Sequence, residues 1–382
     1  MILHAMRSPV TFRREKLYAV LCLLLIVGFL VCTNQRYIFW DETERKIVDV
    51  LPKDPSQIPP IYHPTFVSAA ESYLGNDDMV VGVLKDAEAK AYPVMVLERH
   101  EVVDDVIGGV PVVVSYCPLT GSPVVFERQE NVVYGVSGKL LKNNLVLYDN
   151  RTESLWSQIM MRAVRGNLKG TAFKILPSHL MKWGAWVRLF PSTKLLALPS
   201  TLRQPQYFQM NYAEYRESPA PGIFPLENIN GTFPFKQYVL GVQTEGGSKA
   251  YSFDVLERET ILHDLIGNER VVLTFYGGSG QAFKNAGHVF QFLSDAYMKD
   301  ETGNIWNVVT GELANGTERL EALVYLPVYW FAWYDFHPDT EIYISNRERP
   351  QDLKYPERHN LVSVGRPSFE MLQMWGGESS EQ

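Results

Sequence analysis

Cysteine is scarce in this chain, which has only three in 382 residues. Cys22 and Cys32 lie in an apolar N-terminal stretch, so Cys117 is the one cysteine outside it. A disulfide-stapled fold is therefore excluded. The chain also has no CxxC pair, no HExxH motif and no phosphate-cradling glycine loop. With a net charge of −7 and no block of Lys or Arg, it lacks the basic surface that nucleic acid requires, and no nucleic-acid partner is expected.

The N-terminus contains a long charge-free run. Residues 1–16 carry Arg7, Arg13, Arg14 and Lys16, and Leu17 to Thr33 is apolar and without charge. This length spans a bilayer, and no small-residue cleavage site follows it. We therefore expect a single-pass signal anchor over residues 17–40, with the basic residues 1–16 in the cytoplasm and the rest of the chain periplasmic or otherwise extracytoplasmic. Residues 41–60, charged and rich in proline, are interpreted as a stalk.

Beyond the stalk the pattern is one of short β-type runs broken by Gly, Pro, Asn and Asp, which predicts a mainly β, β-rich α+β fold. Met79 to Glu98 is predicted to be a hairpin. Helical patterns are few, and Ser154 to Met161 and His179 to Arg188 are the expected helices of the first half.

An internal repeat organises the chain. GVLKDAEAKAYPVMVLERHEVVDDVIGG, from Gly82, recurs as GVQTEGGSKAYSFDVLERETILHDLIGN, from Gly241, at a constant offset of 159 residues. We therefore predict a first repeat over 61–198, a linker over 199–234, a second and degenerate repeat over 235–345, and a C-terminal tail over 346–382.

Comparison of the two copies separates scaffold from site. Residues common to both copies are predicted to be structural; they include Asp105, Trp156, Pro177, Trp186 and Pro191. The first copy has His100, Glu101 and Cys117 where the second has Glu259, Thr260 and Tyr276. A single functional site is therefore predicted, in the first repeat.

Cys117 lies in VVVSYCPLTGSPVVFER (112–128), two β-branched runs around a proline- and glycine-containing turn. Two interpretations stay open for it: a small buried hydrophobe, or a thiol that the rigid turn presents. The hairpin through Gly108 and Gly109 is expected to bring His100 toward Cys117. Such a pair is suited to a thiolate for redox work, or, with a carboxylate, to a copper, zinc or iron ion.

These segments resemble the bacterial and archaeal family known as domain of unknown function 3179. The resemblance rests on AKAYPVMVLERHEVVDD (89–105), the Cys117 segment (112–128), YGVSGKLLKNNLVLYDNRTESLWSQ (134–158), LPSHLMKWGAWVRLFPST (176–193) and FAWYDFHPDTEIY (331–343). The resemblance implies a family sequence pattern in which a His-Glu pair is followed by Cys-Pro-Leu-Cys-Gly. This chain keeps His100, Glu101 and Cys117 but has Thr120 at the second sulfur position, which removes a dithiol cycle within the turn.

The leading hypothesis is therefore a membrane-anchored thiol-redox or metal-binding protein that works with an extracytoplasmic redox partner. In it Cys117 is the thiolate or ligand, His100 the activating base or second ligand, and Glu101 the residue that orients the imidazole. The alternative is a non-catalytic binding or assembly module in which the Cys117 turn is purely structural. A hydrolase that uses Ser137 or Ser154 is disfavoured, because the strand-to-helix context of a nucleophile elbow is absent.

Overall fold

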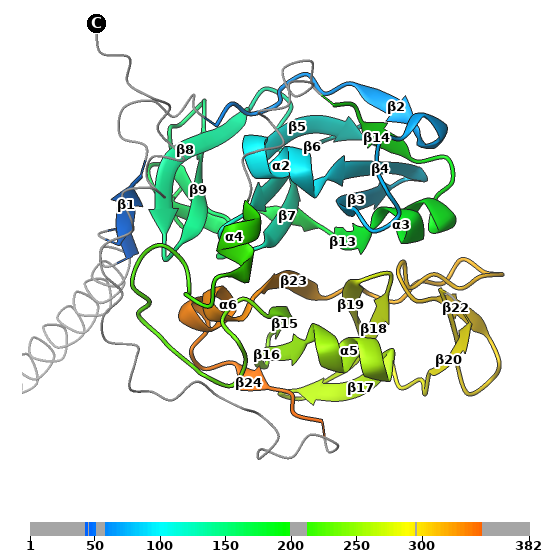
Figure 1. Cartoon of the computed structure of the whole chain (residues 1–382). Coiled ribbons are helices and arrows are strands. Elements are labelled where there is room, and N and C mark those ends of the chain that lie inside the picture. Colours follow the sequence, from blue (N-terminus) through cyan, green and yellow to red (C-terminus); the bar gives the residue numbers. More distant parts are fainter. Residues whose placement is uncertain (1–42, 45, 51–57, 199–211, 295, 346–382) are drawn as a thin grey trace, which may run out of the picture. The chain divides into compact units, whose positions relative to one another are not determined.

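The computed structural model describes residues 43–44, 46–50, 58–198, 212–294 and 296–345 (Figure 1). The expected signal anchor and tail, and part of the expected stalk and linker, lie outside the described residues. Within these ranges no helix has the length and apolar character needed to cross a membrane. Of the unit that ends at Ile47 very little is described, and the account below concerns the unit from Val48 onward.

The fold is mainly β, as the sequence predicts. In the first repeat one sheet has the order β13-β3-β4-β14-β2 and a second has the order β12-β7-β6-β5. A third runs β8-β9-β10-β11, with Val48 and Asp49 of β1 (Ile47–Asp49) at its edge. The strands are β2 (Phe66–Ser68), β3 (Met79–Lys85), β4 (Glu88–Pro93), β5 (Val102–Ile107), β6 (Val110–Cys117), β7 (Ser122–Glu127), β8 (Tyr134–Leu141), β9 (Asn144–Asp149), β10 (Leu155–Ser157), β11 (Arg162–Arg165), β12 (Lys174–Leu176), β13 (His179–Lys182) and β14 (Lys194–Leu196).

The second repeat forms corresponding sheets with the orders β23-β15-β16-β24, β17-β18-β19 and β20-β21-β22. Its strands are β15 (Tyr238–Thr244), β16 (Gly247–Ser252), β17 (Ile261–Ile266), β18 (Glu269–Tyr276), β19 (Ser279–Lys284), β20 (Gln291–Ser294), β21 (Tyr297–Lys299), β22 (Ile305–Asn307), β23 (Val324–Tyr329) and β24 (Glu341–Ile342). The helices of the chain are short: the 3-10 turn η2 (Ala69–Glu71), α2 (Val94–His100), α3 (Trp183–Leu189), α4 (Tyr212–Glu217), α5 (Phe253–Glu259) and α6 (Trp330–Phe336).

Three local predictions need correction. The predicted helix His179 to Arg188 begins only at Trp183, because His179 to Lys182 is the strand β13. The segment Met79 to Glu98 forms the hairpin β3-β4, but α2 begins at Val94, directly after Pro93. The predicted helix Ser154 to Met161 is wrong, because Leu155 to Ser157 is the strand β10. Before this strand, Asp149 closes a turn by accepting hydrogen bonds from the Thr152 amide, at 2.6 Å, and from the indole of Trp156, at 2.9 Å.

This turn occurs in both repeats. Asp300 accepts hydrogen bonds from the Thr302 hydroxyl, at 2.7 Å, and from the indole of Trp306, at 3.0 Å. A buried indole N–H needs an acceptor, and each copy supplies one from a carboxylate six or seven residues earlier. The shared Trp and Asp residues are thus structural in both halves.

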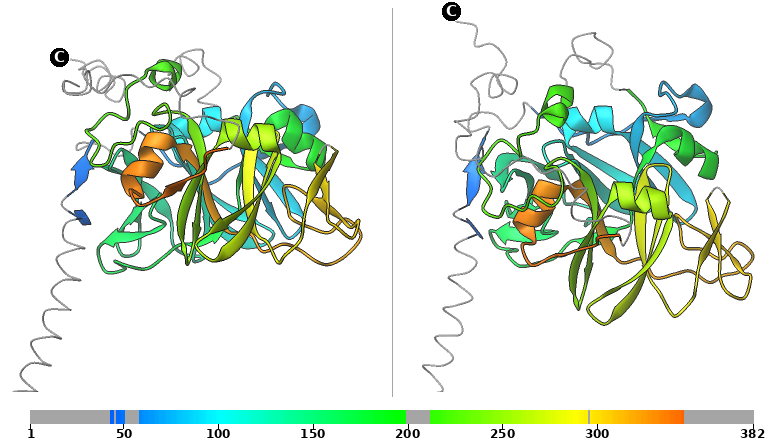
Figure 2. Two further views of the ribbon diagram at one scale, coloured as in Figure 1. Left: turned by 90° about the horizontal axis from the view of Figure 1, so that it is seen from below. Right: turned by 60° about the horizontal axis from the view of Figure 1, so that its bottom comes forward.

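The second helix of each repeat packs on strands of its own repeat, with Trp186 against Gly82 and Trp333 against Gly241, and the apolar core around each helix continues into the other repeat (Figures 1 and 2). Trp330 and Trp333 of α6 belong to the apolar core that also contains Cys117 and the β8-β9 hairpin of the first repeat. Reciprocally, Trp183 and Trp186 of α3 belong to a core with Phe283 and other residues of the second repeat. Each half therefore completes the core of the other, which explains why the two copies form one unit rather than two separate domains.

Backbone hydrogen bonds at the two hairpin tips also connect the two repeats. The amide of Tyr329, which precedes α6, donates to the Thr120 carbonyl at 2.9 Å. The amide of Lys182, which precedes α3, donates to the Gly277 carbonyl at 2.8 Å. The tip that bears Cys117 is therefore held against the second repeat.

Candidate functional site

The Cys117 turn closes the β6-β7 hairpin, whose last pair is Cys117 opposite Ser122. In the second repeat the equivalent pair is Tyr276 opposite Ser279, joined by Gly277 and Gly278 alone. The first repeat inserts Pro118 to Gly121 at this place. The longer tip is specific to the copy that carries the cysteine.

Cys117 is buried, with 1% of its surface exposed, and its sulfur lies 4.0 Å from the Asn143 carbonyl oxygen. Burial raises the pKa of its thiol to about 11, and the negative charge of Glu101 adds to this effect. The interpretation that the rigid turn presents the sulfur to solvent is therefore wrong. The turn is rigid, but it points into the contact between the two repeats.

Two tyrosines of α4 contribute to the cover of the cysteine. Tyr212 and Tyr215 are 5% and 4% exposed, and the Tyr215 hydroxyl donates a hydrogen bond to the Leu119 carbonyl at 2.6 Å. Burial raises the pKa of both phenols well above its usual value, and the charge of Cys117 acts on both. Lys236 lies 3.7 Å above the Tyr215 ring and donates to the Ser218 carbonyl at 3.0 Å, which fixes the end of α4. No sequence pattern indicated that α4 would join the site.

Glu101 is the most perturbed carboxyl group near the thiol. It caps the C-terminus of α2 with a positive φ of 54° and is 3% exposed. Burial raises its pKa to about 8. Thr260 has the same backbone conformation at the end of α5, with φ of 62°. The strained conformation therefore belongs to the scaffold of both repeats, whereas the buried carboxyl group is found in the first repeat only.

His100 ends α2, and its Nδ1 lies 2.6 Å from the Pro59 carbonyl oxygen. Since a carbonyl can only accept, Nδ1 carries the proton. Burial lowers the pKa of His100, so the ring is neutral at pH 7. The group whose charge acts on the Cys117 thiol is Glu101, the residue that the sequence assigned to orienting the histidine.

Asp104 and Asp105 follow Glu101 along β5, and the structure gives the two carboxyl groups different surroundings. Asp105 accepts from Lys90 and from the Tyr92 hydroxyl, at 2.9 and 2.5 Å, which is the arrangement of Asp264 with Lys249 and Tyr251 in the second repeat. Asp104 is 3% exposed and Arg128 Nε lies 3.8 Å away, but no described residue lies in hydrogen-bonding geometry to either of its carboxyl oxygens. Burial raises the pKa of Asp104 to about 7.

A fully buried polar network supports the Cys117 turn, and the sequence analysis missed it. Gln158 accepts hydrogen bonds from the Ser122 hydroxyl, at 2.9 Å, and from the Asn144 amide, at 2.8 Å, and its own amide donates to Ser115 at 3.1 Å. Thr120, at the second sulfur position, shares a hydrogen bond of 2.8 Å with Ser122 and accepts from Asn144 at 3.0 Å. All five side chains are 0% exposed. Thr120 therefore belongs to the support of the turn, and its hydroxyl cannot replace a second thiol.

Within the described residues, no group of three or more His, Cys, Asp or Glu side chains is arranged to hold a metal ion. A pair made of Cys117 and His100 offers too few ligands for the copper, zinc or iron site that the sequence suggested.

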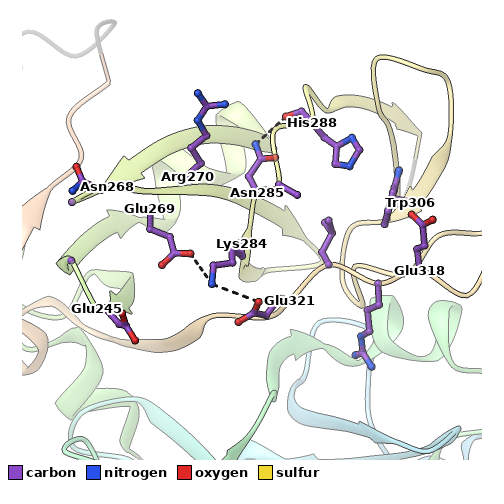
Figure 3. A pocket seen from close by; sticks show the side chains of 15 residues that line it. Glu245, Asn268, Glu269, Arg270, Lys284, Asn285, His288, Trp306, Glu318 and Glu321 are labelled. Carbon is purple, nitrogen blue, oxygen red and sulfur yellow. Dashed lines mark hydrogen bonds and ion pairs between the residues drawn. The ribbon is translucent and has the colours of Figure 1, made fainter.

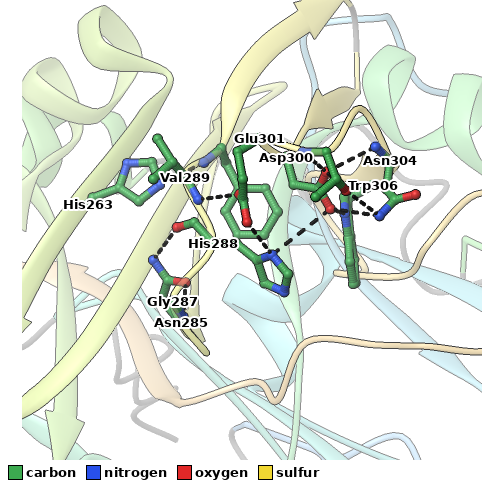
Figure 4. A network of polar contacts seen from close by, with 11 residues as sticks. His263, Asn285, Gly287, His288, Val289, Asp300, Glu301, Asn304 and Trp306 are labelled. Atoms are coloured by element: carbon green, nitrogen blue, oxygen red, sulfur yellow. Dashed lines mark hydrogen bonds and ion pairs between the residues drawn. The ribbon is translucent and has the colours of Figure 1, made fainter.

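The second repeat carries a separate groove of about 1230 Å³ (Figure 3). Lys284 bridges Glu269 and Glu321 across it, at 3.0 and 3.6 Å, and Arg270 and His288 lie on its rim. Beside it, His288 contacts Glu301, whose carboxylate accepts the Val289 amide at 2.8 Å (Figure 4). The groove is lined by the second repeat alone and takes no part in the Cys117 site.

The comparisons with known proteins agree with the resemblance seen in the sequence. No curated protein and no solved structure matches the chain. One family model, described as protein of unknown function (DUF3179), matches residues 55–340, which include the first repeat, the whole Cys117 site and the second repeat up to residue 340. The chain belongs to this family of proteins of unknown function, DUF3179.

Proposed function

We propose that Cys117 is a redox-active thiol that reduces a small peroxide, and that Glu101 is its proton acceptor. The observation that carries this proposal is the coupling of two buried ionisable groups, found only in the first repeat. The Glu101 charge raises the pKa of the thiol, and both groups are nearly inaccessible to water.

Burial of a carboxyl group is unfavourable for folding unless a partner stabilises its charge. The second repeat builds the same helix end with Thr260 and avoids this penalty. Retention of glutamate at the one position that acts on the cysteine therefore supports a chemical role, because perturbed ionisable groups concentrate at functional sites.

In the proposed step, the Glu101 carboxylate accepts the proton of the Cys117 thiol, and the sulfur attacks one peroxide oxygen. An S–O bond forms while the O–O bond breaks, and the leaving oxygen takes the proton from Glu101. The sulfur is oxidised to a sulfenic acid and the peroxide is reduced to water or an alcohol.

The burial of Cys117 determines the size of its reaction partner. A sulfur that is 1% exposed is out of reach of a protein disulfide, so the proposed reaction partner is as small as hydrogen peroxide. The described residues contain no second cysteine, so two equivalents of a small external thiol return the sulfenic acid to the thiol and leave as a disulfide and water. An extracytoplasmic redox partner keeps this small thiol reduced.

In this proposal His100 is a positioning residue for Glu101. Its Nδ1–H donates to the Pro59 carbonyl, which ties the end of α2, and hence Glu101, to the segment before β2. The metal-binding form of the hypothesis is not retained, because the donor set is too small.

The proposal includes attachment to a membrane through residues 17–40, with residues 1–16 in the cytoplasm. It is supported by the charge-free run and its basic flank. If it is right, the full chain stays in the membrane fraction through alkaline carbonate extraction and a chain without residues 17–33 does not. Recovery of both in the soluble fraction would contradict it.

The test of the redox step is chemical trapping of the oxidised cysteine. The folded full chain is treated with hydrogen peroxide, freed of peroxide and then unfolded in urea with dimedone. It is expected to gain one dimedone adduct at Cys117, and Cys117→Ser is expected to gain none there. Protein that is unfolded before the peroxide treatment serves as the positive control for trapping. An adduct after oxidation of the unfolded chain but not after oxidation of the folded chain would exclude the proposal.

A second function is favoured by one observation. The Cys117 thiol has a pKa raised to about 11, and the backbone of its turn is hydrogen-bonded to the other repeat. Both properties are typical of a purely structural cysteine. In this case the chain is a binding or assembly module without catalysis. An inert folded Cys117 in the trapping experiment would favour this alternative.

A further inference from the structure

The reduction step of the proposed function needs more room at Cys117 than the closed fold offers. A thiol that attacks the sulfenic acid forms a mixed disulfide, in which the two sulfur atoms lie about 2 Å apart. Cys117 is 1% exposed, so even a small thiol reaches it only when part of the structure above it moves away.

One part of this structure belongs to no sheet of the described chain. It is the segment Tyr212 to Phe224, which we call the α4 cover. Its Tyr212 and Tyr215 are buried in the core that contains Cys117, and α4 lies at the outside of the fold beside α2 (Figures 1 and 2). The strands β6 to β9 around the thiol are instead joined by backbone ladders. A segment outside such ladders opens at a lower free energy than a strand within them.

A single side chain of the first repeat holds the end of the α4 cover. The amide oxygen of Asn143 accepts the Ile223 and Phe224 amides, at 2.7 and 2.6 Å, and its nitrogen donates to the Phe224 carbonyl at 3.1 Å. Asn143 is 0% exposed, and its own carbonyl oxygen is the one that lies 4.0 Å from the Cys117 sulfur. The residue beside the thiol therefore also fastens the α4 cover over it.

Further side-chain contacts hold α4 itself. The Tyr215 hydroxyl donates to the Leu119 carbonyl at 2.6 Å, and Arg216 pairs with Glu98 of α2. The Arg216 side chain is 41% exposed, and an ion pair this open to solvent stabilises little. The bonds made by Asn143 and Tyr215 are therefore the polar contacts that contribute most to closure.

We infer that the α4 cover opens as a unit to admit small thiols to Cys117, and that the Asn143 side chain holds it closed. In the closed form the thiol is shielded from large molecules; in the open form the reductant reaches the sulfenic acid. The inference takes its reductant from the proposed function, but the opening itself requires no peroxide and is measured without one.

Alkylation of Cys117 by iodoacetamide at pH 8 measures the opening in the folded full chain in detergent, with peptide mass spectrometry as the readout. Asn143 is the second residue of the two-residue turn between β8 and β9 and has a φ of 67°, so Asn143→Gly removes the side chain without backbone strain. The matched control is Ala87→Gly. Ala87 is exposed and has a φ of 65° at the same position of the turn between β3 and β4.

We expect Asn143→Gly to be alkylated at least about tenfold faster than the wild type and Ala87→Gly, because three hydrogen bonds that close the α4 cover are lost. In all three proteins the rate should change little as urea is raised to about 1 M, since a short segment exposes little surface when it opens. Tyr215→Phe keeps the ring but loses the bond to the Leu119 carbonyl, and it should be alkylated faster than the wild type with the same weak dependence on urea.

Equal alkylation rates in the wild type, Asn143→Gly and Tyr215→Phe would overturn the inference. A rate that climbs steeply with urea in all of them would overturn it too, because Cys117 would then be reached only by unfolding of the whole chain. Fast alkylation of Asn143→Gly that is independent of urea, combined with a failure to trap a sulfenic acid, would reject the peroxide step and support the α4 cover. A trapped sulfenic acid combined with equal alkylation rates would support the peroxide step and reject the α4 cover.

Discussion

Replacement of Glu101 by glutamine is expected to stabilise the protein at alkaline pH. The native pKa of this carboxyl group is about 8, because the group is buried, and in the unfolded chain it is about 4.3. The native state therefore holds a proton that the unfolded state has lost, and stability falls as pH rises from about 4 to about 8. Above pH 8 a buried charge remains in the native state. Glu101→Gln removes this penalty.

From the size of the pKa shift, the free energy of unfolding of Glu101→Gln should exceed that of the wild type by about 3 to 5 kcal/mol at pH 9, and by little at pH 5. Urea unfolding at the two pH values measures it. The buried Asp104, whose pKa is also raised by burial, titrates in both proteins and so cancels from the difference. Glu257→Gln, on the exposed face of the equivalent helix α5, is the control and should change stability by less than about 0.5 kcal/mol. A Glu101→Gln protein that is less stable than the wild type at pH 9 would mean that the native state stabilises the carboxylate, contrary to this account.

Replacement of Gln158 by leucine is expected to destabilise the protein by about 3 to 5 kcal/mol. The amide of Gln158 holds Ser115, Ser122 and Asn144, and its loss leaves several buried polar groups without partners at about 1 to 3 kcal/mol each. Because these residues support the Cys117 turn, we also expect the thiol to react faster with the bulky reagent dithionitrobenzoate, by at least tenfold under native conditions.

The second repeat offers a matched control for this variant. Gln281 accepts from Thr274 at 3.2 Å and donates to Ser279 at 2.8 Å in the smaller network below the Gly277-Gly278 turn. Gln281→Leu should lower stability while the accessibility of Cys117 stays near that of the wild type. Equal exposure of Cys117 in both variants would show that the effect comes from general loss of stability and that the Gln158 network has no special role in the turn.

The duplication made much of the scaffold predictable from the sequence. Shared residues such as Asp105 and Trp156 make equivalent hydrogen bonds in both copies, and the hairpin around Cys117 follows from its β-branched runs and the turn residues between them. The helix predicted over Ser154 to Met161 is wrong, because Thr152 and Ser154 belong to the turn that orients Trp156.

The environment of the cysteine could not be predicted, because it depends on contacts between distant parts of the chain. Tyr215 reaches the turn from 96 residues away, and Tyr329 reaches it from the other repeat. A local pattern of residues carries no information on such partners. The sequence therefore left open whether Cys117 is buried or presented by the turn, and the structure shows that it is buried.

The most direct test of the central claim is the pH dependence of Cys117 oxidation by hydrogen peroxide in the wild type and in Glu101→Gln. If Glu101 accepts the thiol proton, the wild-type rate rises through a step near pH 8, where the carboxyl group ionises, and this step is absent in the variant. Glu101→Gln should then oxidise more slowly at pH 8.5 by at least about tenfold, although loss of the neighbouring charge lowers the pKa of its thiol. Profiles without a step near pH 8 in either protein, rising only as the thiol itself ionises, would contradict a proton-acceptor role for Glu101.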